Sequence, residues 1–162
     1  MKSLFLKATL FTLALALLVS ACGSQPATSA DLPTYPGAVA LKPGEDPVAD
    51  TLAKNMEQDA SIRQSMGAGG KIEQFSYRLP ADGNWEAVKA FYDKELKAAG
   101  WKSGVGGIAG DIANQAIEAA TQGSDMMKMS MWSKGKQTLT IIRLQELPTS
   151  TQAYLIISLN SN

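Results

Sequence analysis

Alternating apolar and polar positions mark three segments of the chain, 73–79, 127–132 and 138–145, as strands with one buried face. A fourth segment, 153–159, is rich in leucine and isoleucine and is also predicted to be a strand. Residues 133–136 (Ser-Lys-Gly-Lys) are typical of a hairpin turn. The pattern predicts a meander of three antiparallel strands that the 73–79 strand joins.

Apolar residues at helical spacing predict a first long helix from Pro47 to Met66. Asp46 is placed to cap its N-terminus, and Gly67 is placed to end it. The repeating apolar positions are Val48, Leu52, Met56 and Ala60.

A second helix is predicted from Asn84 to Ala99, and its pattern is the most regular in the chain. Asn84 or Asp82 is suited to cap its start. Gly100 is expected to adopt a left-handed conformation after its last turn, and Trp101 to pack back on that turn as in a Schellman motif. The apolar stripe consists of Trp85, Val88, Tyr92, Leu96 and Ala99.

These elements predict an α+β fold, with a three- to four-stranded antiparallel sheet and two main helices packed on one face. A glycine-rich insert, 104–123, interrupts them. Residues 104–109 fit a dinucleotide-binding fingerprint formally, but they follow a helix and not a strand, so we interpret the insert as a loop or lid.

Composition excludes several chemistries. The chain of 162 residues has one cysteine and no histidine, so an internal disulfide, a Cys/His zinc site and imidazole catalysis are ruled out. Two of its 15 basic residues, Lys2 and Lys7, belong to the N-terminal segment, which leaves 13 against 15 acidic residues. That balance gives no reason to expect nucleic acid as a partner.

The N-terminal segment has the layout of a secretory signal. Lys2 and Lys7 precede an uncharged apolar run of twelve residues, 8–19, which small residues follow. A membrane-spanning helix needs about 20 apolar residues, so we expect export and not permanent insertion.

Val19-Ser20-Ala21-Cys22, with Leu18 before it, resembles the lipobox of bacterial prolipoproteins. The resemblance implies that diacylglycerol is attached to the Cys22 thiol and that the signal is cleaved before this residue. The alternative, an ordinary signal peptide, leaves a free thiol unexplained in an oxidising compartment. Gly23 stands where an aspartate commonly retains such proteins at the inner membrane, which favours the outer membrane in a host with two membranes.

These features divide the chain into a cleaved signal peptide, 1–21, a lipidated cysteine with a flexible tether, 22–34, and one α+β domain, 35–162. Tyr35-Pro36-Gly37-Ala38 predicts a type II turn at the start of the domain. Together with Val88, Phe91-Tyr92, Leu96 and Gly100-Trp101, this turn resembles a pattern of uncharacterised extracytoplasmic lipoprotein domains. The resemblance implies fold and location but no active site.

The remaining candidate sites have simpler structural interpretations. The aromatic residues Trp85, Phe91, Tyr92 and Trp101 are suited to stack on a sugar or lipid, but their helical spacing favours core. Thioether sulfur suits Cu(I), yet the period-two spacing of Met127, Met129 and Met131 favours a sheet face.

No catalytic, cofactor-binding or metal-binding residues are assigned, and Cys22 is the single functional residue predicted. The leading hypothesis is a non-enzymatic, lipid-anchored envelope protein that presents a binding or structural domain. The alternative is a carrier or sensor of a small apolar ligand, with a pocket between helices and sheet. An enzyme has the least support because the carboxylates are scattered.

Overall fold

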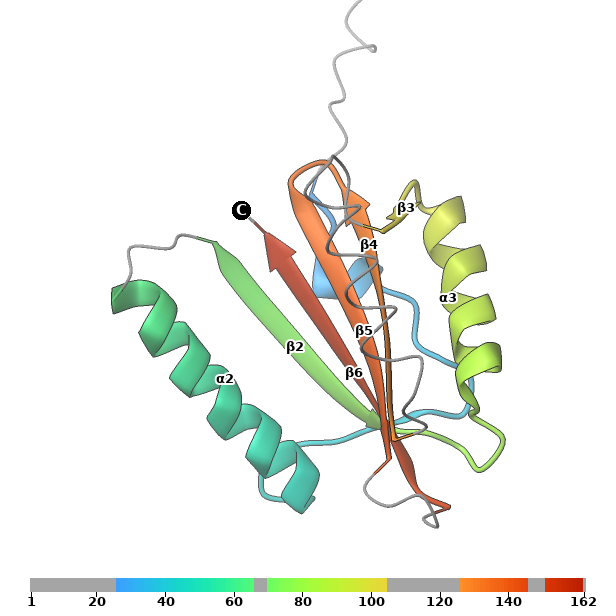
Figure 1. Ribbon diagram of the computed structural model, residues 1–162, viewed down its shortest axis with the longest axis horizontal. Helices are drawn as coiled ribbons and strands as arrows, with labels where there is room; N and C mark the ends of the chain where they lie inside the picture. The colour runs from blue at the N-terminus through green and yellow to red at the C-terminus, as the bar shows by residue number, and fades with distance from the viewer. Residues whose placement is uncertain (1–25, 66–69, 105–125, 146–150, 162) are drawn as a thin grey trace, which may run out of the picture.

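One antiparallel sheet, in the strand order β1-β2-β6-β5-β4-β3, organises the protein (Figure 1). This computed structural model describes residues 26–65, 70–104, 126–145 and 151–161. The strands are β1 (Val39–Ala40), β2 (Lys71–Arg78), β3 (Lys102–Ser103), β4 (Met127–Lys134), β5 (Gln137–Gln145) and β6 (Ala153–Ser161).

The predicted α+β class with an antiparallel sheet is confirmed, and the predicted number of three to four strands is wrong, because the sheet has six. The meander β4-β5-β6 forms as expected, and β2 adds beside β6. The two strands that the sequence did not predict, β1 and β3, have two residues each. Segments that short cannot display an alternating pattern.

The core lies between the sheet and helix α3 (Trp85–Ala98). Phe75, Ile157 and Ile141 occupy one row across β2, β6 and β5, so their side chains lie on the same face of the sheet. The residues of this core with no more than 2% exposure are Val88, Tyr92 and Leu96 of α3 and Trp132, Leu139, Ile141, Leu155, Ile157 and Leu159 of the sheet.

Both ends of α3 follow the sequence prediction. Asn84, and not Asp82, is the N-cap, and its side-chain oxygen accepts a hydrogen bond of 2.9 Å from the Ala87 N–H. Gly100 has a φ of +83°, and the Trp101 N–H donates to the Leu96 carbonyl at 2.9 Å. This is a Schellman motif, and it turns Trp101 into the core, where 4% of the residue is exposed.

Helix α2 (Pro47–Ser65) lies apart from that core. Asp46 caps it as predicted, by accepting a hydrogen bond of 2.9 Å from the Val48 N–H. The helix contacts β2, near the edge of the sheet opposite to α3 (Figure 1). None of its described residues belongs to the core cluster. The sequence predicted both helices packed on one face; in the structure α3 covers the core and contacts β3 and β4, whereas α2 contacts β2, where Asp46 forms an ion pair with Arg78.

Candidate functional site

The segment that follows Cys22 in the sequence joins the folded domain at one end of the sheet. The sequence predicted a flexible tether over residues 22–34. In the structure, Ala27 and Leu32 already pack against the core, together with Tyr35. A short 3-10 helix, η1 (Ser29–Asp31), lies between them. Residues 1–25, with the predicted lipobox and Cys22, lie outside the described residues.

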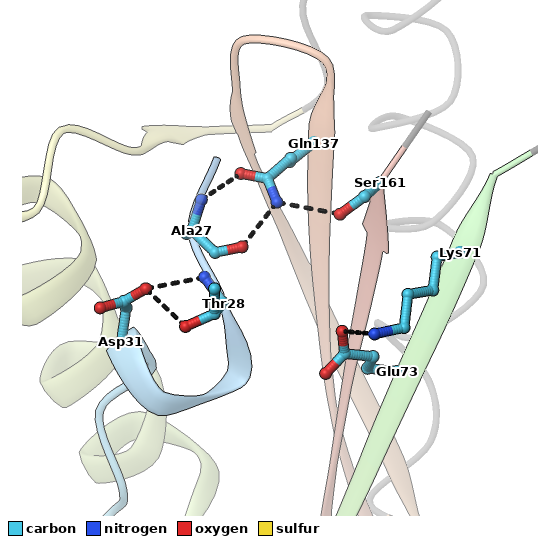
Figure 2. Close-up of polar contacts among 7 residues, drawn as sticks. All are labelled: Ala27, Thr28, Asp31, Lys71, Glu73, Gln137 and Ser161. Atoms are coloured by element: carbon cyan, nitrogen blue, oxygen red, sulfur yellow. Dashed lines mark hydrogen bonds and ion pairs between the residues drawn. The ribbon is translucent and has the colours of Figure 1, made fainter. Parts of the chain in front are cut away.

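Gln137, the first residue of β5, binds this segment through its side-chain amide (Figure 2). Its Oε1 accepts from the Ala27 N–H at 2.8 Å, and its Nε2 donates to the Ala27 carbonyl at 2.8 Å. The same Nε2 donates to the Ser161 hydroxyl at 2.9 Å. Gln137 is only 6% exposed, so a buried amide satisfies both polar backbone groups of Ala27.

Two carboxylates at the same end of the domain, those of Asp31 and Glu73, form polar contacts with neighbouring residues (Figure 2). Asp31 accepts hydrogen bonds of 2.7 Å from the Thr28 N–H and from the Thr28 hydroxyl. These bonds, helped by the charge of Lys134, hold the pKa of Asp31 below its ordinary value. Glu73 accepts from Lys71 at 2.7 Å, and this bond lowers the pKa of Glu73 in the same way.

The predicted type II turn precedes the first strand. The Ala38 N–H donates to the Tyr35 carbonyl at 3.0 Å, and Gly37 has a φ of +75°. A side chain at Gly37 would also meet the ring of Pro80 at 3.4 Å. The turn therefore needs glycine there, and it directs Val39 and Ala40 into β1.

A groove of about 250 Å³ lies between α2 and β2. Its walls are mostly apolar, and Gln74 and Ser76 contribute polar groups. Its apolar residues include Leu41, Ala49, Leu52, Ala53, Met56 and Phe75. The volume is slightly below the usual range for small-molecule pockets, which begins at roughly 300 Å³.

The aromatic cluster is core, as its spacing predicted. The rings of Phe91 and Tyr92 meet edge to face with centroids 5.0 Å apart, and Tyr35 meets Phe91 in the same way at 5.4 Å. Tyr92 and Trp101 are buried, and Trp85 and Phe91 are partly buried. Packing in or against the core therefore accounts for these rings.

The three methionines of β4 share one face of the sheet, opposite to the one that buries Trp132. Met129 lies across from Ile142, and Met127 across from Leu144. The three methionines therefore lie on one sheet face, as their spacing indicated, although Met131 lies across from Thr140 and Met127 is 39% exposed. Among the residues that the structure describes, no three His, Cys, Asp or Glu side chains gather in a group suited to a metal ion.

Cys22 and most of the glycine-rich insert lie outside the described residues, so the predicted lipidation site and lid are not among the groups placed above. Within the described ranges, no helix is both long and apolar enough to cross a membrane. No protein-family model, curated protein or solved structure matches the chain.

Two polar contacts of the structure were not predicted from the sequence. The Gln137 amide joins positions 110 apart, and no local pattern reports a contact of that range. The Asp46–Arg78 ion pair, with an N–O distance of 2.7 Å, joins a predicted cap to the end of a predicted strand. For the Gln137 contact, the sequence held one signal of a buried polar group. Gln137 begins a strand, and the next residues on the same face of that strand, Leu139 and Ile141, are apolar.

Proposed function

We propose that this protein is a lipid-anchored lipoprotein of the bacterial cell envelope that presents a non-enzymatic binding or structural domain. The observation that carries the proposal is the sequence Val19-Ser20-Ala21-Cys22 after an apolar run of twelve residues. Diacylglycerol on the Cys22 thiol, followed by cleavage before this residue, would anchor the mature chain. Each buried acyl CH₂ contributes about 0.8 kcal/mol, so two or three chains hold a protein stably on a membrane.

The manner in which the chain enters the domain is consistent with anchoring. Ala27, five residues after Cys22, is held by two hydrogen bonds of 2.8 Å to a buried side chain. A domain attached this way would be presented at a defined end and at a short distance from the bilayer. Gly23 favours the outer membrane in a host that has two membranes.

Mass spectrometry of the mature N-terminus, combined with membrane fractionation, tests the proposal. Wild-type protein should begin at Cys22, carry acyl chains and sediment with membranes. The Cys22→Ala variant should be released from the membrane fraction or retained as the uncleaved precursor. An unmodified Cys22 in the wild type would refute the proposal, as would a variant that is cleaved and still membrane-bound.

The groove between α2 and β2 supports a second candidate function, a carrier or sensor of a small apolar ligand. Its walls combine apolar side chains with the polar groups of Gln74 and Ser76, as ligand pockets do. Native mass spectrometry of protein purified from cells should then show a bound small molecule. Ala53→Phe, which places a ring in the groove, should remove that mass, and Ala90→Phe on the exposed face of α3 should keep it. An empty wild-type protein would contradict this function.

A further inference from the structure

Four lysines gather at the end of the domain where the chain arrives from Cys22. Lys134 and Lys136 flank Gly135 in the turn between β4 and β5, directly before Gln137. Lys102 of β3 is adjacent, because it pairs with Ser133. Lys97 belongs to the last turn of α3 and completes the group. We name this group, Lys97, Lys102, Lys134 and Lys136, the lysine end.

We propose that the lysine end docks the domain on anionic phospholipid headgroups of the membrane that holds Cys22. The inference rests on the proposed lipid anchor and adds to it an oriented, charge-dependent contact between the folded domain and the lipid surface.

The lysine end lies next to the point of attachment. Gln137, which holds Ala27, directly follows the turn that contains Lys136. Lys134 Nζ donates to the Ala99 carbonyl at 2.9 Å, which brings the C-terminal end of α3 to the same place. Figure 1 shows the β4–β5 turn, β3 and the end of α3 together at one end of the sheet, with the first described residues beside them.

The length of the connection fixes which end faces the lipid. Cys22 and Ala27 are five residues apart, and a fully extended chain covers at most about 17 Å over that number of residues. An acylated Cys22 therefore keeps Ala27 within that distance of the lipid surface, so the adjoining lysine end can approach the headgroups to within one Debye length, about 8 Å at physiological salt. The opposite end of the sheet, with the turn at Ala81, is directed away from the bilayer.

The charge of this end is in excess and accessible. Lys97, Lys102 and Lys136 are exposed, and none forms an ion pair with a residue that the structure describes. The described acidic side chains at this end are Asp31, whose charge interacts with that of Lys134, and Glu73, which forms an ion pair with Lys71. The rest of the chain beyond the N-terminal segment has more acidic than basic residues, so an uncompensated cluster of lysines stands out from the average.

Stabilisation of the helix accounts for only part of the cluster. Lys97 and Lys134 lie at the C-terminal end of α3, where cations interact favourably with the helix dipole. Lys102 and Lys136 make no contact with that helix end among the described interactions. Basic residues near an anionic membrane each contribute an attraction equivalent to about fivefold in binding. Since the anchor already holds the domain at high local concentration, a few such residues suffice.

The orientation can be measured on the intact lipidated protein. Acylation consumes the only thiol of the chain, so a cysteine introduced elsewhere is labelled selectively. Ser103→Cys places a fluorophore at the lysine end, and Ala81→Cys places one at the opposite end. Each labelled protein is reconstituted into two kinds of vesicle, one of phosphatidylcholine alone and one that also contains 30% phosphatidylglycerol. Both kinds carry a spin label on the lipid headgroups, which quenches a fluorophore that lies close to the membrane surface.

In the anionic vesicles, the label at 103 should be quenched about threefold more than the label at 81. In neutral vesicles, or in the anionic ones at high salt, the difference should shrink. Replacing Lys97, Lys102 and Lys136 by Gln should abolish the effect of phosphatidylglycerol. The control, Lys42 and Lys54 replaced by Gln, removes positive charge from exposed positions before and within α2 and should preserve it.

Equal quenching of both labels, or quenching that ignores lipid charge, would overturn the docking while leaving the anchor intact. Failure of the wild-type protein to float with neutral vesicles would overturn the lipid anchor, and the docking with it. Lysine-dependent binding to duplex DNA that exceeds binding to anionic vesicles would assign the lysine end to another class of partner and would also overturn the proposal.

Discussion

The amide of Gln137 pairs with both backbone groups of Ala27, as a neighbouring β-strand would, although the two residues are 110 positions apart. The side chain occupies the first position of β5 and also reaches Ser161, the last residue of β6. One buried glutamine thus joins the entering chain to the two central strands of the sheet, β5 and β6.

Removing this amide should detach the entering chain. Gln137→Ala leaves the N–H and carbonyl of Ala27 without their partners, at a cost of about 1–3 kcal/mol in the free energy of unfolding. Denaturant unfolding measures the loss, and hydrogen exchange at Ala27 should become faster. Gln58→Ala, at an exposed position of α2, should change the stability by no more than about 0.5 kcal/mol. Equal exchange at Ala27 in wild type and Gln137→Ala would show that the contact does not hold the chain.

Acid should weaken the same region through Asp31. The pKa of Asp31 in the folded protein lies below its ordinary value of 3.8, because Thr28 donates two hydrogen bonds to the carboxylate. The unfolded chain therefore binds the proton at higher pH than the folded one does. The Asp31 contribution to stability is complete above that ordinary value and decreases as the pH falls through the folded-state pKa.

Asp31→Asn removes that titration. Unfolding measured between pH 6 and pH 2.5 should show a smaller pH dependence in the variant than in the wild type, with most of the difference below pH 4. Asp82→Asn, at an exposed turn position, serves as the control and should follow the wild type. Identical pH profiles for Asp31→Asn and wild type would contradict the assignment.

The sequence pattern predicted those parts of the fold that depend on residues close together in the chain, such as helix ends. Gly100 and Trp101 fall where a Schellman motif needs them, and the structure places both there. The position of α2 did not follow in this way, because its apolar spacing indicated a buried face without identifying the surface that covers it. That surface is β2, and the Asp46–Arg78 pair that fixes the contact is a tertiary interaction.

The candidate site shows the same division. The lipobox is a contiguous pattern, and the sequence alone suggests Cys22. The lysine end combines residues of α3, β3 and the β4–β5 turn, which are distant in the sequence and approach each other only through strand pairing. The net charge of the whole chain gave no indication of this cluster, because the chain has equal numbers of basic and acidic residues.

Asp46 should contribute more to the free energy of unfolding than an ordinary helix cap does. Its Oδ1 accepts from the Val48 N–H, and its Oδ2 lies 2.7 Å from Arg78 Nη2. Burial opposes its ionisation, but the hydrogen bonds from Val48 and Arg78 and the charge of Arg78 outweigh burial, so the pKa of Asp46 is lowered. Both contacts favour the charged carboxylate.

Asp46→Ala removes the cap and the ion pair and should cost about 1–3 kcal/mol, whereas Asp46→Asn retains a capping oxygen and should cost less. The helical signal in circular dichroism should melt earlier for Asp46→Ala. Glu45→Ala removes an exposed neighbouring carboxylate and should have little effect. Equal losses for the Asn and Ala variants would assign the whole effect to the ion pair and contradict a role for the cap.

At Tyr92, unlike at the positions above, removing a polar group should not destabilise the fold. The residue is fully buried, and its hydroxyl approaches the Tyr35 backbone but has no hydrogen-bond partner with good geometry within the described structure. Burial raises the pKa of Tyr92 well above its ordinary value, so the hydroxyl stays neutral.

A buried hydroxyl without a partner destabilises the folded state. Tyr92→Phe should therefore leave the free energy of unfolding unchanged or raise it by about 1 kcal/mol, while Tyr92→Ala should lower it by about 3–5 kcal/mol. Denaturant unfolding of both variants provides the measurement, and a loss above about 2 kcal/mol for Tyr92→Phe would show that the hydroxyl has a strong partner.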